Sequence, residues 1–318
     1  APVTSDEDIA NAYVGTDISF AGDRANLSAS LAGEGYRIRD YRRQSLLPDV
    51  SISYTPTDDH VFTLGWQAFH NYPAYWYRQT YRREVDGYEV NLGNPDLRVA
   101  RYNIASLNYV CRSRYAFNVY YYHVRDAFFT LLYQSPDRLE LIKQITNTDL
   151  SHVWVLSASV PVTIGGRWFL TFAPTAFHEH YRTDHWHDLS FDVAGWAGGM
   201  NVSSQLSLLS RPRLTFTTDG YYYSGGRQGL QKSSESWGVN AGLQLALLRD
   251  ESLLIGLNVN DLFESTTPIA RTRYQSQWSD YDYFGGISRS IRLRLTYRFS
   301  RYKEKQRREA DRSRIGIQ

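Results

Sequence analysis

The stretch SIRLRLTYRFS, residues 290–300, alternates basic side chains with large apolar ones. Arg292, Arg294 and Arg298 are the basic residues, and leucine, tyrosine or phenylalanine occupies the positions beside them. Successive side chains of a β-strand point to opposite faces, so this segment would have one guanidinium face and one apolar face. Such a strand fits a wall with water or polar protein on one side and a nonpolar medium on the other.

The same period of two recurs along most of the chain, with Gly, Pro, Asp and Ser clusters between the alternating segments. We predict an all-β, antiparallel chain with about thirteen strands. The predicted strands lie near residues 9–20, 24–36, 46–55, 59–70, 97–111, 114–132, 148–162, 167–180, 188–208, 212–223, 234–248, 252–262 and 287–299.

The connections between these strands alternate between two kinds. Short turns are predicted at 21–24, 55–59, 111–114, 163–167, 210–213 and 249–251. Longer connections, rich in tyrosine, glycine and charge, are predicted at 36–46, 70–97, 133–148, 180–188, 223–234 and 263–287. Tight turns on one side and long loops on the other are typical of transmembrane β-barrels, whereas a soluble sandwich or propeller has no reason to sort its loops in this way.

The size of the sheet decides which face meets which medium. In 236–247, leucines at positions 243, 245 and 247 alternate with small or polar residues, a pattern that alone would also suit a soluble barrel. About thirteen strands would enclose a lumen too wide for side chains to fill, so the lumen must be wet or plugged and its lining polar. The apolar face then meets lipid. Girdles of Tyr and Trp at the two interfaces would account for the 25 Tyr and 8 Trp.

Composition excludes several other classes. The net charge of +2 gives no reason to expect nucleic acid as a partner. Mean hydropathy is −0.47, and no apolar run approaches the roughly 20 residues of a membrane-spanning helix. The single cysteine, Cys111, excludes an internal disulfide framework. No catalytic motif is present, so we predict that the chain is not an enzyme, and the sequence implies no cofactor.

The direction of the strands predicts a division of the chain. Residues 1–299 are expected to form the barrel portion and residues 300–318 a basic periplasmic tail. If the last strand runs toward the periplasm, an odd number of strands places residue 1 on the extracellular side. Because bacterial single-chain barrels have even strand numbers, we predict that this chain is the C-terminal part of a larger barrel.

Three short stretches resemble a known family. GNPDLR (93–98), LNVNDLFE (257–264) and LRLTYRFS (293–300) are similar to signatures of the outer-membrane β-barrel of TonB-dependent receptors. The resemblance implies a 22-stranded barrel closed by an N-terminal plug that contacts TonB and located in the bacterial outer membrane. It also implies as partners the lipid bilayer, a plug domain or N-terminal part of the same receptor, and the TonB system indirectly. A surface lipoprotein is a further candidate partner. This chain departs from the family pattern, because it contains no plug or TonB box.

Candidate site residues fall into three groups. The loop 70–97 supplies aromatic planes and arginines suited to gripping sugars, peptides or siderophores, and the best ligand-binding candidates are Tyr75, Trp76, Tyr77, Tyr81, Arg82 and Arg83. The lumen- or plug-facing candidates are Arg292, Arg294 and Arg298, which we expect to pair with acidic groups; an anion path is the alternative.

The third group is the segment HEHYRTDHWHD (178–188), which holds His178, His180, His185 and His187. Imidazoles are common ligands of Zn, Cu and Ni. Strand parity, however, predicts that all four face outward above the membrane, away from a transport path. We therefore predict no metal site, with these histidines as the weak candidates.

Together these features predict an outer-membrane receptor barrel that binds and imports a nutrient ligand: a glycan, a peptide or a metal chelate. The alternative is a plug-free outer-membrane channel, or a secretion or structural scaffold, that operates without energy coupling. An enzyme is a more distant hypothesis that would require a Ser–His–acid cluster to meet in space.

Overall fold

The computed structural model describes residues 7–20, 22, 24–38, 41–187, 189–228, 231–248, 251–265, 269–274, 277–282 and 289–299. The predicted basic tail, 300–318, lies outside the described residues.

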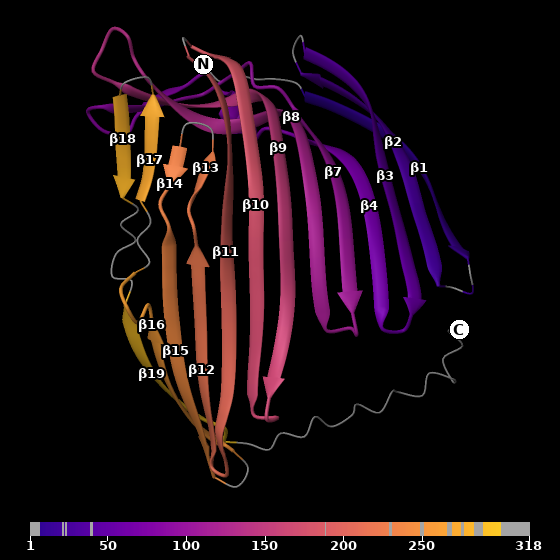
Figure 1. Cartoon of the computed structure of the whole chain (residues 1–318). Coiled ribbons are helices and arrows are strands. Elements are labelled where there is room, and N and C mark those ends of the chain that lie inside the picture. Colours follow the sequence, from indigo (N-terminus) through magenta and orange to yellow (C-terminus); the bar gives the residue numbers. More distant parts are fainter. Residues whose placement is uncertain are drawn as a thin grey trace, which may run out of the picture.

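Long antiparallel strands follow one another in chain order to form one curved sheet, whose edge strands are β1 and β19 (Figure 1). The thirteen strands of this path are β1 (Glu7–Phe20), β2 (Ala25–Ile38), β3 (Tyr41–Thr57), β4 (His60–Asn71), β7 (Ala100–Cys111), β8 (Tyr115–Gln134), β9 (Leu141–Ile164), β10 (Trp168–Trp186), β11 (Leu189–Ser210), β12 (Arg213–Tyr223), β15 (Ser236–Leu247), β16 (Leu253–Asn260) and β19 (Ser290–Tyr297). Each coincides with a predicted strand, so the all-β antiparallel prediction is confirmed.

Shorter elements lie within the connections. A 3-10 helix, η1 (Tyr75–Arg78), precedes a hairpin of β5 (Arg82–Glu84) and β6 (Glu89–Leu92), and β6 pairs in parallel with β9. A second sheet has the strand order β13-β14-β17-β18. Its strands are β13 (Gly226–Gln228), β14 (Gln231–Ser233), β17 (Ile269–Tyr274) and β18 (Gln277–Asp282).

The two ends of the sheet differ as the sequence predicted, with one correction. Short hairpins gather at the lower end in Figure 1, and the second sheet and the connection between β4 and β7 lie at the upper end. The connections at 36–46, 133–148 and 180–188, however, are not long loops. Strands continue through most of their residues and leave only short turns, because backbone pairing between strands does not depend on side-chain polarity.

Register fixes the two faces of the sheet. Directly paired residues share a face, and one such row of neighbours runs through Leu206, Phe216, Leu243, Leu257 and Leu293. The adjacent row on the opposite face runs through Gln205, Thr217, Gly242, Asn258 and Arg292. Leu243 is 38% exposed and Leu293 is 73% exposed, so the leucines do not fill a dry interior. An apolar outer face and a polar inner face are what a membrane barrel requires.

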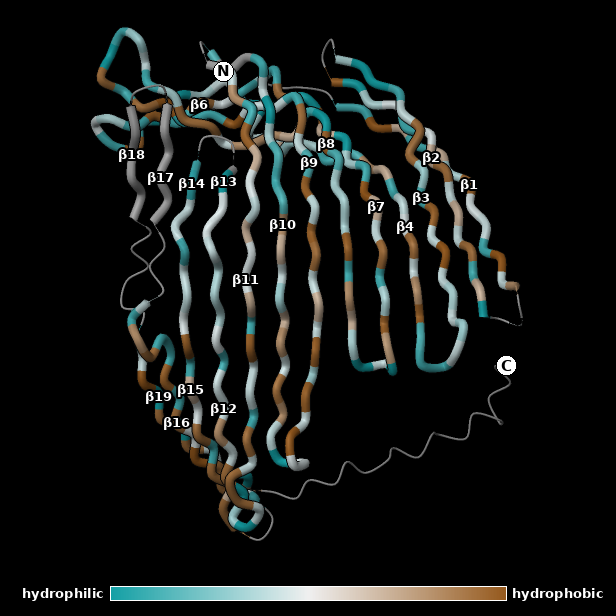
Figure 2. The backbone as a smooth tube through the Cα atoms, viewed as in Figure 1, coloured by the Kyte–Doolittle hydropathy of each residue, from teal (hydrophilic) through white to brown (hydrophobic). Residues whose placement is uncertain are grey.

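The height of the apolar face matches a bilayer. On β10, Trp168 near the lower turn and His178 share the apolar face and are ten residues apart. At about 3.3 Å per residue and a tilt of about 45°, this separation corresponds to roughly 23 Å, close to the apolar band of known barrels. Hydrophilic residues gather at the upper ends of the strands (Figure 2). In the part of the chain that the structure describes, no helix is long and apolar enough to cross a membrane.

Candidate functional site

Residues 72–99, between β4 and β7, form a folded connection that we call the canopy. It contains η1 and the β5–β6 hairpin. The canopy contacts β2 on one side and β9 on the other, each two strands away from the strands that it joins. On β2 it meets Glu34 and Tyr36, which share the polar face of Ser28 and Ser30 by strand alternation. The canopy therefore lies on the lumen side of the wall.

Arg78, the last residue of η1, anchors the canopy to the first two strands. Its side chain is only 6% exposed. One terminal nitrogen, Nη1, donates to the hydroxyl of Tyr36 and lies 3.5 Å from the carboxylate of Glu7. The Tyr36 hydroxyl in turn donates to Glu7 at 2.6 Å. The guanidinium carbon lies 5.7 Å from the centre of the Tyr36 ring, which is within the range of a cation–π contact.

A second polar cluster lies at the point where β4 passes into the canopy. Glu34 accepts a hydrogen bond from the hydroxyl of Tyr72, and the same carboxylate oxygen lies against Nδ1 of His70. The side chain of His70 is 1% exposed. Burial and the neighbouring Glu34 carboxylate raise the pKa of Tyr72, so this phenol stays protonated and acts as a donor. A buried carboxylate is tolerated because both neighbours face it.

The other side of the canopy is held to β9 by the pairing of β6, by an ion pair between Lys143 and Glu89, and by side-chain hydrogen bonds. The side chain of Asn94 donates to the carbonyl of Ile145 at 3.0 Å, and the side chain of Gln144 donates to the carbonyl of Gly93 at 2.9 Å. The Asn94 side chain also accepts from the backbone of Asp96, which closes a tight turn. The GNPDL stretch is thus, with β6, one of the two segments that join the canopy to β9.

The predicted ligand-binding residues occupy different positions on this canopy. Trp76 is 64% exposed, Tyr75 and Tyr81 are also exposed, and Tyr77 lies edge-on to Trp76 with ring centres 5.9 Å apart. Arg82 forms an ion pair with Glu140 beside β9. Arg83 is exposed and pairs through its backbone with Asn91.

Arg78 was not predicted to have a role. It stands in the same run of aromatic and basic residues, YWYRQTYRR, as the exposed candidates, and the run has no period that separates a buried arginine from an exposed one.

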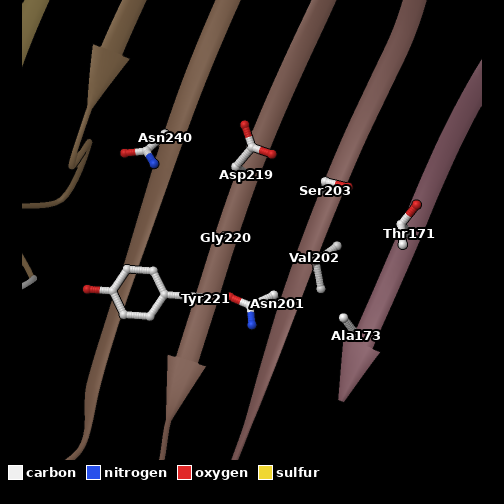
Figure 3. Close-up of a pocket in the computed structure, with 9 residues that line it drawn as sticks. All are labelled: Thr171, Ala173, Asn201, Val202, Ser203, Asp219, Gly220, Tyr221 and Asn240. Carbon is white, nitrogen blue, oxygen red and sulfur yellow. The ribbon is translucent and has the colours of Figure 1, made fainter. Parts of the chain in front are cut away.

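The inner face of the wall is lined by small polar side chains. A shallow depression of about 280 Å³ crosses β10, β11, β12 and β15 (Figure 3). Its polar lining residues are Thr171, Asn201, Ser203, Asp219, Tyr221 and Asn240. Register places Arg292 and Arg294 on this same face, opposite Asn258 and Gly256, and both are exposed. Arg298 follows the end of β19, where its backbone N–H donates to the carbonyl of Ser252.

The structure separates the four histidines of 178–188. His178 and His180 share the outward face, as predicted. The ring of His187 instead lies against that of Tyr133 at an angle of 34°. Tyr133 packs against the inward-facing cluster of Leu131, Tyr181 and Phe191, so the prediction that all four face outward was wrong. The side chain of His185 lies outside what the structure describes. Among the described residues, no group of three or more His, Cys, Asp or Glu is placed to hold a metal ion.

Comparison with known proteins identifies the class. The model of the outer membrane protein beta-barrel family matches residues 26–297, which is most of the chain. The chain belongs to this family and is located in the bacterial outer membrane. The resemblance read from the three short motifs is confirmed at the level of the family. Comparison with curated proteins gave no significant match.

Solved structures share the fold. The FrpB iron transporter from Neisseria meningitidis has a TM-score of 0.59 at 13% identity, covering 92% of this chain and 45% of that one. The siderophore receptor PirA from Pseudomonas aeruginosa has a TM-score of 0.54 at 16% identity, covering 83% and 45%. A mutant of the ferric enterobactin receptor PfeA from the same species, in complex with enterobactin, has a TM-score of 0.54 at 12% identity, covering 81% and 40%. The chain spans less than half the length of these proteins.

Proposed function

We propose that this chain forms part of the wall of an energy-coupled outer-membrane receptor that binds and imports a scarce nutrient. The observation behind the proposal is the canopy, which is fixed to the wall at β2 and at β9 and carries exposed aromatic side chains. Rigid aromatic planes held by a structured scaffold can bind a ligand with little loss of conformational entropy.

Within this function the ligand contacts are Tyr75, Trp76, Tyr77, Tyr81 and Arg83. Arg82 has a different role, because its ion pair with Glu140 ties the β5–β6 hairpin to the tip of the β8–β9 turn. A glycan, a peptide and a metal chelate all suit this surface. The structural neighbours, an iron transporter and siderophore receptors, make a metal chelate the first of the three to test.

A plug domain would occupy the lumen against the polar inner face. The wall offers it hydroxyl and amide groups around Asp219, and Arg292 and Arg294 offer it donors for carboxylates. Coupling to TonB would then pass through the plug. The plug-free channel is the alternative function, since the same polar lining would also suit a water-filled pore.

The test uses the intact protein in the outer membrane and a panel of probes: ferric enterobactin, an oligosaccharide mixture and an oligopeptide mixture. We expect saturable uptake of one class, which is lost on depletion of TonB. Trp76→Ala should weaken binding of that probe at least tenfold because the ring is the most exposed aromatic of η1. Tyr54→Ala, which removes an outward-facing ring near the opposite end of the sheet, is the control and should leave binding unchanged.

TonB-independent flux that does not saturate, together with ion conductance of the purified protein in planar bilayers, would favour the plug-free channel. No binding of any probe, or equal binding by the Trp76 variant, would remove the canopy as the ligand site.

A further inference from the structure

Three histidines from three neighbouring strands form a row on the outward face. His123 on β8 is directly opposite His152 on β9, and His152 is directly opposite His180 on β10. The rings of His123 and His152 are 4.8 Å apart between centres, and those of His152 and His180 are 6.0 Å apart. The row is distinct from the canopy and from the lumen wall, so import through the lumen does not use it.

The row lies at a defined height above the hydrocarbon. Two residues lower on the same face, Trp154, His178 and Trp196 line an apolar recess of about 350 Å³ together with Leu156. Trp rings mark the boundary between hydrocarbon and headgroups. The histidine row therefore lies at headgroup level, where water and ions reach it, and the rings of His123 and His152 are half-buried rather than enclosed.

The Nδ1 atoms of His123 and His152 do not form a good hydrogen bond with each other. Their Nδ1 atoms face each other at 3.3 Å, which is longer than an ordinary hydrogen bond. Nδ1 of His152 also lies 2.7 Å from the hydroxyl of Tyr121. An imidazole nitrogen has either one lone pair or one N–H in the ring plane, so Nδ1 of His152 cannot serve both neighbours fully. A shared cation between the two nitrogens removes the conflict.

The separation fits a transition-metal ion. Imidazole nitrogens bind zinc at about 2.0–2.1 Å, and two such ligands of a tetrahedral ion are therefore about 3.3 Å apart. We propose that His123 and His152 bind one divalent ion of the Zn, Cu or Ni class through their Nδ1 atoms, with the Tyr121 oxygen or water at the remaining positions. His180 stays outside this pair because its Nε2 lies 2.6 Å from the carboxylate of Asp192.

The test measures metal binding by the intact protein purified in detergent with a tag that contains no histidine. After removal of metal with a chelator, equilibrium dialysis against Zn²⁺ gives stoichiometry and affinity, and Cu²⁺ electron paramagnetic resonance counts the imidazole ligands. We expect one ion per protein and a signal from two imidazole nitrogens. His123→Phe and His152→Phe should each weaken binding at least tenfold and leave at most one imidazole ligand.

The matched controls are His178→Phe and His180→Phe, which change histidines of the same face on a neighbouring strand. Both variants should bind Zn²⁺ with an affinity within threefold of that of the unchanged protein. Heat-modifiable migration in gels verifies that every variant has a folded barrel. The proposal is overturned if folded His123 and His152 variants bind as well as the controls, or if the copper signal of the unchanged protein shows fewer than two imidazoles.

Discussion

Gly93 faces the carbonyl oxygen of Gln79 so closely that a Cβ at residue 93 would lie 1.8 Å from that oxygen. The same Cβ would also meet the ring of Tyr81 at 2.8 Å. Two passes of the canopy backbone meet here, where the Gly93 N–H donates to the carbonyl of Tyr81. The glycine of the GNPDL stretch is thus required by close backbone approach and not by a turn.

Gly93→Ala should therefore force apart the two canopy segments that meet here, because the oxygen of Gln79 belongs to the backbone and cannot rotate away. We expect protease cleavage within 72–99 to accelerate at least tenfold while the strands stay intact. Gly87→Ala is the matched control. Gly87 also lies in the canopy, and a Cβ added there would meet nothing within 4 Å. Equal protease resistance of the two variants would contradict the close packing at Gly93.

The Glu34 cluster gives a second prediction. Glu34→Ala leaves the buried Nδ1 of His70 and the hydroxyl of Tyr72 without their acceptor. Each buried polar group that loses its partner should lower the free energy of unfolding by about 1–3 kcal/mol. Denaturant unfolding in micelles measures the loss. Glu84→Ala, which removes an exposed carboxylate from the canopy, should stay within about 0.5 kcal/mol; a similar effect of both changes would refute the role of the cluster.

The membrane orientation can be tested on two neighbouring residues of β15. Leu243 belongs to the apolar outer row, and Gln244 belongs to the polar inner face opposite Gly256. Leu243→Arg should lower the free energy of unfolding from a bilayer by about 2–4 kcal/mol, since it puts a charge into hydrocarbon. Gln244→Arg should have little effect. If the inner substitution were the more damaging of the two, the assignment of the faces would be reversed.

The β5–β6 hairpin should respond to acid through Asp86. The backbone N–H groups of Tyr88 and Glu89 each donate to one oxygen of this carboxylate at 2.7 Å and lower the pKa of Asp86 below its usual 3.8. A depressed folded-state pKa adds stability above the unfolded pKa, and that stability is lost as pH falls through the folded pKa. Hydrogen-exchange protection of Tyr88 and Glu89 should drop below pH 4. Asp86→Asn should show no such drop, and an equal drop in that variant would assign the effect elsewhere.

The strands were predictable because alternation over ten or more residues is a strong and local signal. β15 and β16 could be predicted from leucines that alternate with small or polar residues. The upper ends of β3, β9 and β10 were missed, because a change to polar residues marks the point where a strand leaves the membrane and not the point where it stops pairing. In the candidate site, Tyr75 and Trp76 are exposed, and their contact with a ligand stays a prediction. The burial of Arg78 could not be predicted, because it depends on Glu7 and Tyr36, which are distant in the chain.

By itself, the sequence determined the period of two and, with it, the presence of an apolar and a polar face on each strand, since alternation is a property of a single extended segment. Only the tertiary structure decided which side chains meet across strands. His123, His152 and His180 are 29 and 28 residues apart in the chain and become neighbours through the registers of β8, β9 and β10. Pairing between strands is set by the whole sheet, so no local pattern shows which of these residues will meet.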